Sequence, residues 1–470
     1  MTERHIHNPL QNSLQNPLVS EFLDRVCREV KAKEMHNDIR EELLGHLDDR
    51  VEQLVEVEGK SEKEAIAEAI KQMGNPVAIG EGLHKVHRPK IDWGLLLLVG
   101  AMVVISIVSL LLLNSTYLDY KWGNHLVMIK ARNGIAAIAM MFAIAFLNYR
   151  RLLRLSSALY MLTVGLMLAS LVFGTQVNGM NGWIRIYGLG TFFAFNVSEI
   201  VPYLLIIAAS GMLYRHKGLG GDKSMRGDKK AVTGKTAFVK ELALFVIVPG
   251  FFFLAAHSFV PLLFYAMGLT ILLTISGRFK LILALAGSLA MVTVNLLWFQ
   301  GGRFSYIGSR LTSFLHHDTD AGYATKQSIN AISSAGLWGK GWGIPSANLT
   351  LPEFSSEMLF SYLIQNLGWV FGAVIISVVL LFVVRMIKIG LRLRDEYAKL
   401  LTIGLTGLFG VQFVWNFVMC LGFLPIMGFS LPLINWNSIS LLEFAAVGLL
   451  LSIFRRKDMM PSNLQGEQAV

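Results

Sequence analysis

Charged residues are scarce in this chain. Only 16% of its 470 residues are charged, whereas a soluble globular chain carries charge at roughly a quarter of its positions. Hydrophobic residues make up 54% of the chain, and the mean hydropathy is +0.53. This shortage of charge excludes a protein whose only solvent is water, and it predicts an integral membrane protein.

Cysteine is nearly absent. Cys27 and Cys420 are the only two, and they lie far apart without the spacing of metal ligands. We therefore expect both to be ordinary packing residues, as free cysteines usually are.

We also expect no secretory signal peptide in this sequence. The residues before Trp93 are polar and charged, and they contain neither an apolar core region nor a small-residue cleavage site. We expect the first transmembrane helix to act as the signal instead.

Long apolar runs dominate the rest of the chain. Runs of about 18 to 25 residues are long enough to cross a hydrocarbon core of roughly 30 Å. They lie at 93–113, 125–147, 152–173, 199–213, 241–257, 259–276, 281–300, 358–384, 400–420 and 438–454. The expected fold class is all-α: a polytopic membrane protein of about ten transmembrane helices behind a small soluble helical domain.

The net charge of +10 reflects topology rather than nucleic-acid binding. Alternate short loops hold about twenty Lys and Arg, against about six in the loops between them. The basic loops are expected on the cytoplasmic side of the cytoplasmic membrane, so both termini are predicted to be cytoplasmic. Three loops then fall outside, at 174–197, 300–356 and 422–437. The absence of a fixed-period repeat argues weakly against an inverted-repeat transporter.

Four regions follow along the chain. The predicted regions are a disordered tail (1–18), a cytoplasmic helical prefix domain (19–90), the transmembrane domain with its large outer loop at 300–357 (91–457), and a cytoplasmic tail (458–470).

The prefix domain shows helical periodicity. Apolar residues recur on one helix face at Ile39, Leu43, Leu47, Val51 and Leu54. Ser61 and Glu64 then form a predicted capping box, opening a helix that ends at Gly74-Asn75-Pro76. Through HLDDR, Gly59-Lys60-Ser61 and MGNP, the segment resembles the helical prefix domain found in front of some bacterial permeases and anti-sigma-type proteins.

Ionisable residues inside or beside a bilayer are costly, so each is a candidate for function. The candidates are Lys130, Arg132, Glu199, Glu357 and Glu443. Four of the five lie towards the predicted outer face. Snorkelling at a helix end is the simpler interpretation for Lys130, and for Arg132 it is as good as the functional one.

The outer loop at 300–357 holds further candidates. His316 and His317 stand beside Asp318 and Asp320, a set that suits a divalent cation, Mg²⁺ or Mn²⁺, although such clusters are more often solvated loops. The Gly-rich stretch 336–343 allows either backbone approach to a pyrophosphate or tight turns alone.

Several segments together resemble the SEDS family (shape, elongation, division and sporulation), whose members RodA, FtsW and SpoVE are membrane glycosyltransferases. The matching segments, in the family's order, are NGWIRI with NVSEI, RLTSFLHHDTDAGYATKQSINAISSAGLWGKGWG, LPEFSSEMLFSYLIQNLGW and NFVMCLGFLPIMGFSLPLINWNSIS. The resemblance covers about residues 93–457.

The resemblance implies peptidoglycan synthesis in cell division, cell shape or sporulation. Lipid II is polymerised at the outer leaflet, where a sugar 4-hydroxyl attacks an anomeric carbon and undecaprenyl pyrophosphate leaves. The family's essential Asp falls at Glu357, which would act as the general base. Arg310 and Lys340 would contact the pyrophosphate. Other matching positions are Glu199, Tyr323, Gln327, Ser328, Asn416, Pro425 and Pro432, and Arg132 is a further substrate-binding candidate.

Some positions depart from the family pattern. Pro202 stands where the family has a Lys, Met427-Gly428 replaces its Thr-Gly, and residues 435–439 rewrite its closing signature. Gln365-Asn366 replaces an acidic pair. A non-catalytic scaffold that binds lipid-linked precursor or a partner synthase is therefore an alternative, and a precursor transporter is a third. The implied partners are lipid II, membrane lipid and a transpeptidase of the penicillin-binding class, with no nucleic acid.

Overall fold

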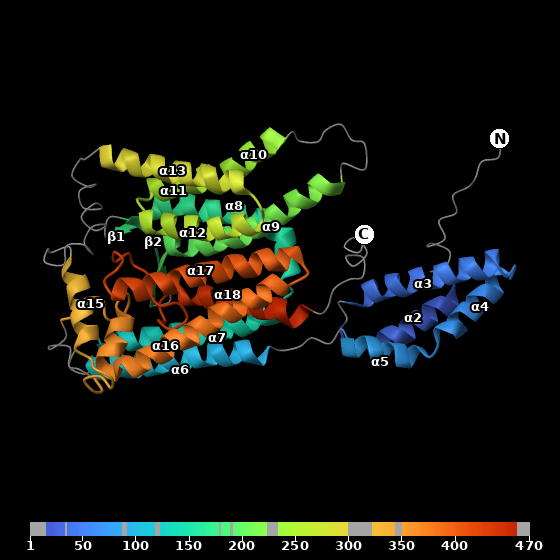
Figure 1. The fold of residues 1–470 in the computed structure, drawn as a ribbon, viewed down its shortest axis with the longest axis horizontal. Helices are drawn as coiled ribbons and strands as arrows, with labels where there is room; N and C mark the ends of the chain where they lie inside the picture. Colours follow the sequence, from blue (N-terminus) through green and yellow to red (C-terminus); the bar gives the residue numbers. More distant parts are fainter. Residues whose placement is uncertain are drawn as a thin grey trace. The chain divides into compact units, whose positions relative to one another are not determined.

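The structure is a computed structural model that describes residues 16–32, 35–86, 92–117, 123–177, 180–188, 191–222, 234–298, 322–343 and 350–457. The chain forms two compact units, Met1–Ile91 with Phe454–Val470, and Asp92–Ile453. Helices dominate the described part of both units (Figure 1). The predicted tail at 458–470 lies outside the described residues, as do residues 1–15.

The described residues of the first unit form four helices. They are α2 (Pro17–Glu29), α3 (His36–Glu56), α4 (Glu62–Met73) and α5 (Pro76–Val86). α2 begins inside the segment 1–18 that was predicted to be disordered, because Pro17 suits a first helical position and the Asn16 side chain caps the Leu18 N–H at 3.0 Å. Apolar side chains from α2, α3 and α4 form one core.

Two local predictions for this unit are confirmed. Ser61 and Glu64 form the capping box, in which the Ser61 hydroxyl accepts the Glu64 N–H and the Glu64 carboxylate accepts the Ser61 N–H. Cys27 is buried and free, and burial raises the pKa of its thiol above the ordinary value. Cys420, in the second unit, is likewise buried and free.

The second unit is a helical bundle, and an all-α polytopic membrane protein is confirmed. Seven of its described helices are long and apolar enough to span a membrane, and two shorter apolar helices accompany them. All ten predicted runs fall on helices: α6 (Trp93–Thr116), α7 (Gly123–Phe146), α8 (Arg150–Phe173), α9 (Val197–Asp222), α10 to α11 (Gly234–Leu242, Ala243–Ile247 as η2, Val248–Ala255), α12 (Phe259–Ile275), α13 (Phe279–Trp298), α16 (Leu359–Arg392), α17 (Glu396–Cys420) and α18 (Ser440–Arg456).

Helix α9 lies at the centre of the bundle. It packs against α8, α12 and α17, and 78% of its most apolar 18-residue stretch is buried inside the protein. Small residues permit the close approach: a Cβ added at Gly211 would lie 2.6 Å from Ser156 Cβ, and one at Gly404 would lie 2.8 Å from Ile206. This packing of small residues is typical of membrane helices, which gain little from the hydrophobic effect between them.

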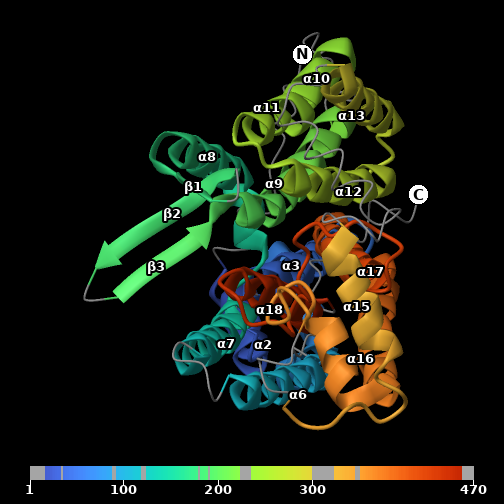
Figure 2. The ribbon, with the colours of Figure 1, turned by 90° about the vertical axis from the view of Figure 1, so that its left-hand side faces the viewer.

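One end of the bundle carries the described parts of the connections that were predicted to be external (Figure 1). A short helix, α15 (Tyr323–Ser333), crosses this end. Loop 174–197 forms a three-stranded antiparallel sheet of β1 (Thr175–Val177), β2 (Met180–Gly188) and β3 (Thr191–Asn196), whose β2–β3 hairpin points away from the helices (Figure 2). Only a loop was predicted for these residues.

Helix α16 is broken at Gly368, where φ is +83° and ψ is 176°. The Gly-rich stretch fills the break through backbone hydrogen bonds. Lys340 N–H donates to Gln365 O at 2.9 Å and Gly341 N–H to Asn366 O at 3.1 Å, while Trp369 N–H donates back to Gly336 O at 3.1 Å. The unpaired groups of the broken helix are thereby satisfied.

Replacing Gly368 by Ala tests this junction. Its Cβ would lie 2.1 Å from Leu337 O, in a backbone region that essentially only glycine adopts, so we expect a loss of about 1–3 kcal/mol in stability. The measurements are the thermal unfolding midpoint in detergent and hydrogen exchange of residues 336–343. The matched control is Gly100→Ala in α6, where an added Cβ meets nothing within 4 Å. Equal midpoints for the two variants would contradict the assignment.

Candidate functional site

Glu357 lies in the non-helical segment that leads into α16. Its side chain is half-buried, and its carboxylate Oε2 accepts the Gly428 N–H at 3.2 Å. Its backbone carbonyl accepts a hydrogen bond from Asn416 Nδ2 at 2.9 Å. Residues far apart in sequence thus hold both the backbone and the carboxylate of Glu357.

Gly428 suits this contact because its φ is +72°. A Cβ built at Gly428 would lie 3.7 Å from Glu357 Oε1, an ordinary van der Waals distance. A larger residue at position 428 would therefore be strained by the positive φ of its backbone and not by a clash with Glu357. The family's Thr-Gly pattern retains its glycine here, and that glycine is the one that meets the carboxylate.

Lys130 contradicts the snorkelling interpretation. Only 5% of it is exposed, and its ammonium donates to Ser355 O at 2.8 Å, Asn435 Oδ1 at 2.6 Å and Asn437 Oδ1 at 2.9 Å. A long side chain at a helix end looks the same in sequence whether it turns towards water or into the protein. Three oxygens brought together by the fold decide the direction here.

Arg132 lies two residues further along α7 and is exposed. Residues two apart do not share a helix face, so Arg132 does not join Lys130. Gly134, four residues after Lys130, does share its face and lies against the Trp436 ring, where a Cβ would come within 2.1 Å of Cε3. The Lys130 face of α7 therefore packs against the closing segment 430–440.

Glu199 is exposed at the start of α9, and its carboxylate accepts a hydrogen bond from Asn196 Nδ2 at 3.0 Å. This contact joins the last residue of β3 to the first turn of α9.

Glu443 has a different environment. It is fully buried, and it accepts the Leu433 N–H at 2.9 Å and Gln412 Nε2 at 3.4 Å. Gln412 also accepts the Tyr203 hydroxyl at 2.8 Å. Leu433 has a φ of +63°, so Glu443 holds an unusual backbone turn in the closing segment.

Tyr323 and Gln327 lie on α15. Tyr323 is 49% exposed, and Gln327 Oε1 accepts the Thr350 hydroxyl at 2.9 Å. The buried Ser328 hydroxyl, on the residue after Gln327, contacts Cys420 O and the Ser361 hydroxyl, each at 2.6 Å. α15 is thereby fastened to the ends of α16 and α17 beside Glu357.

Lys340 is exposed within the Gly-rich stretch. Because the N–H groups of Lys340 and Gly341 are used by the break in α16, this stretch serves backbone packing rather than an open cradle for pyrophosphate. Arg310 and the cluster at 316–320 lie outside the described residues. Among the residues that are described, no group of three or more His, Cys, Asp or Glu side chains is placed to hold a metal ion.

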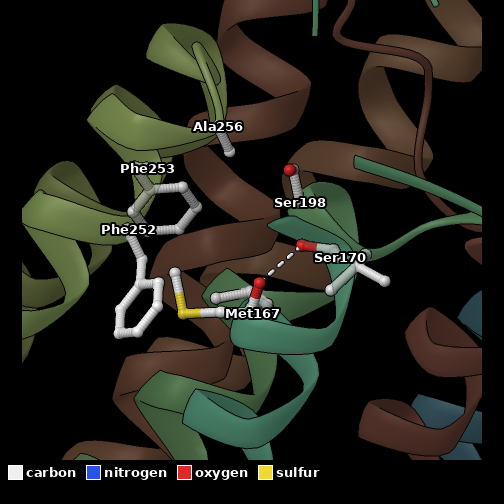
Figure 3. A pocket seen from close by; sticks show the side chains of 8 residues that line it. Met167, Ser170, Ser198, Phe252, Phe253 and Ala256 are labelled. Carbon is white, nitrogen blue, oxygen red and sulfur yellow. Dashed lines mark hydrogen bonds between the residues drawn. The ribbon is translucent and has the colours of Figure 1, made fainter. Parts of the chain in front are cut away.

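A small apolar pocket lies between α8, α9 and α11 (Figure 3). Met167, Phe252, Phe253 and Ala256 line it, and the Ser170 hydroxyl is turned back onto the Met167 carbonyl at 2.8 Å. Ser198, the neighbour of Glu199, also lines it. No ionisable side chain lines this pocket, so it is not a candidate site for the chemistry.

Sequence reasoning missed Asn435, Asn437 and Gly134. They stand where the closing signature departs from the family pattern or inside an apolar run, so no recognisable pattern marks them. The only signal was the polarity of two asparagines beside a transmembrane helix.

Comparisons with known proteins agree with the geometry. Residues 89–459 match the FtsW/RodA/SpoVE family, described as cell cycle protein. The chain is 30% identical over 310 residues to a probable peptidoglycan glycosyltransferase FtsW of Coxiella burnetii, covering 63% of this chain and 77% of that protein. It is also 30% identical over 224 residues to the peptidoglycan glycosyltransferase MrdB of Escherichia coli K12, covering 44% and 60%.

Two solved structures share the fold. A chain from a structure described as the structural coordination of polymerization and crosslinking by a peptidoglycan synthase complex aligns with a TM-score of 0.59 at 21% identity, covering 78% of this chain and 98% of that one. The crystal structure of the rod shape determining protein RodA of Thermus thermophilus aligns with a TM-score of 0.54, covering 78% and 97%. Because the family match covers most of the chain, from residue 89 to residue 459, this chain belongs to the FtsW/RodA/SpoVE family of cell cycle proteins.

Proposed function

We propose that this protein is a peptidoglycan glycosyltransferase that polymerises lipid II at the outer face of the cytoplasmic membrane. The observation that carries the proposal is Glu357 at the end of a transmembrane bundle, where the Gly428 N–H holds its carboxylate and Asn416 Nδ2 holds its backbone carbonyl. The names of the relatives support the same activity.

In the proposed reaction, the 4-hydroxyl oxygen of one disaccharide forms a bond to the anomeric carbon of another. The bond from that carbon to the pyrophosphate oxygen breaks, and undecaprenyl pyrophosphate leaves with the electron pair. The hydroxyl proton passes to the Glu357 carboxylate, which acts as general base. Exposed Lys340, with Arg310, is proposed to offset the negative charge on the leaving pyrophosphate.

The Glu at position 357 changes the reach of the base relative to the family's Asp. A Glu carboxylate lies about one methylene farther from the backbone, and a misplacement of about 1 Å costs about a hundredfold in rate. In this chain the Gly428 N–H meets the longer side chain and fixes its end.

The membrane orientation is also proposed. Glu357, Glu199 and α15 lie at the end of the bundle whose loops carry few Lys and Arg, while the opposite loops carry most of them. By the positive-inside rule the site faces outward and both termini are cytoplasmic. A transpeptidase partner is proposed by analogy with the peptidoglycan synthase complex that shares the fold.

Replacing Glu357 by Gln tests the proposed base. Gln keeps an oxygen for the Gly428 N–H but cannot take the proton, so we expect glycan strand formation from lipid II to fall by at least about a hundredfold. Glu357→Asp should also lose activity, because its carboxylate no longer reaches Gly428. Strand length and rate are measured on gels with purified protein, while the unfolding midpoint checks the fold.

The matched control is Glu353→Gln in the same segment. Glu353 is exposed, and its contact with the Ser356 hydroxyl can be kept by Gln, so activity should be unchanged. Full polymerisation by Glu357→Gln would overturn the catalytic assignment. Absence of strands from the unaltered protein, with lipid II binding retained, would favour the non-catalytic scaffold, and precursor crossing vesicles without polymer would favour a transporter.

A divalent cation, Mg²⁺ or Mn²⁺, is proposed to enter with the pyrophosphate. Magnesium commonly binds through one or two carboxylates together with substrate phosphates rather than in a protein cage. The described residues fit that mode, because Glu199 is an exposed carboxylate at the start of α9 and Glu357 is kept for the proton transfer.

Chelation tests this mode of binding. EDTA should abolish strand formation and added Mg²⁺ or Mn²⁺ should restore it, while the unfolding midpoint of the substrate-free protein stays the same. Polymerisation that continues in EDTA would contradict the need for a cation. A midpoint that falls on chelation would point instead to a cation held by the protein itself.

A further inference from the structure

Three successive backbone carbonyls lead into Glu357, and each accepts a hydrogen bond from a different side chain. Lys130 Nζ donates to Ser355 O at 2.8 Å, Asn435 Nδ2 to Ser356 O at 3.0 Å, and Asn416 Nδ2 to Glu357 O at 2.9 Å. The donors come from α7, the closing segment and α17. We call these three contacts the carbonyl clamp.

Lys130 connects the clamp to the rest of the site. Its ammonium has three N–H donors, and all three are used, by Ser355 O and by the side-chain oxygens of Asn435 and Asn437. All three acceptors are neutral oxygens. Burying an ammonium is costly, and a neutral apolar residue would pack there at lower cost. The charge therefore calls for a role other than filling space.

We propose that Lys130 is a positioning residue for Glu357, an inference that rests on the proposed function. The clamped carbonyls of residues 355–357 set the position of the Glu357 Cα and the direction of its Cα–Cβ bond. The Gly428 N–H then sets the other end of the side chain. The Glu357 side chain is thus held at its backbone and at its carboxylate. If the backbone of residues 355–357 shifts, the carboxylate shifts with it relative to the substrate.

Two of the residues that hold Lys130 lie in the segment 435–439, where this chain departs from the family pattern. Asn435 and Asn437 supply acceptors for the Lys130 ammonium, and Lys130 brings a cation to the Glu357 segment from α7.

Two variants separate hydrogen bonding from charge. Lys130→Met removes both, whereas Lys130→Gln keeps two N–H donors without the charge. For a positioning role we expect kcat for strand formation to fall about a hundredfold in Lys130→Met, with KM for lipid II within about twofold, and to recover in part in Lys130→Gln. The matched control is Lys280→Met, because Lys280 is exposed on α13, and its kcat should not change.

Hydrogen exchange supplies a measure that does not depend on activity. Exchange of the peptide covering residues 350–358 should rise in Lys130→Met and stay unchanged in Lys280→Met. Should Lys130→Met fail to fold, Asn437→Ala removes one acceptor at a half-buried position and is expected to give a smaller loss of kcat with a smaller rise in exchange.

The outcomes distinguish the inference from the proposed function. Full kcat in Lys130→Met, or a rise in KM alone, would overturn the positioning role while Glu357→Gln still tests the base. If the unaltered protein makes no strands, the proposed function fails and the positioning role fails with it. Unchanged exchange at 350–358 in folded Lys130→Met would overturn the carbonyl clamp itself.

Discussion

Backbone groups that leave a helix inside a packed membrane bundle need new hydrogen-bond partners, and the functional end of this protein depends on how that need is met. Two irregular stretches lie there, one before α16 and one opposite its break at Gly368. The first is bound by side chains from α7, α17 and the closing segment, and the second by backbone pairing with residues 336–343. Because an unpaired carbonyl in such surroundings is costly, these contacts hold both stretches in one arrangement.

Polar side chains in the bundle core support the same end of the molecule. Tyr203, Gln412 and Glu443 form a hydrogen-bonded series that holds Leu433 and Ser430 in the closing segment. That segment presents Asn435 and Asn437 to Lys130, and Gly428, just before it, presents its N–H to Glu357. Side chains of the core thereby support the Glu357 carboxylate, although it lies in a non-helical segment. A general base needs such support because it must meet its substrate at a fixed distance.

Much of the fold could be predicted because its signals are local. Apolar runs long enough to cross a bilayer became helices, and the Ser61–Glu64 capping box formed because its partners are three residues apart. The hairpin of β2 and β3 could not be predicted in the same way, because pairing within a short loop leaves no long periodic pattern. The Gly-rich stretch permitted two interpretations, and only its contact with the break in α16 decided between them.

The sequence by itself determined the membrane class, the helices and the family, because length, hydropathy and ordered motifs are properties of the chain alone. It also marked Glu357, through its place in a motif. The tertiary structure decided that Lys130 turns inward and that Asn435 and Asn437 receive it, because the acceptors of that ammonium lie more than two hundred residues away along the chain. Where a buried charge points depends on which oxygens the packed helices bring to it, and no local pattern contains that information.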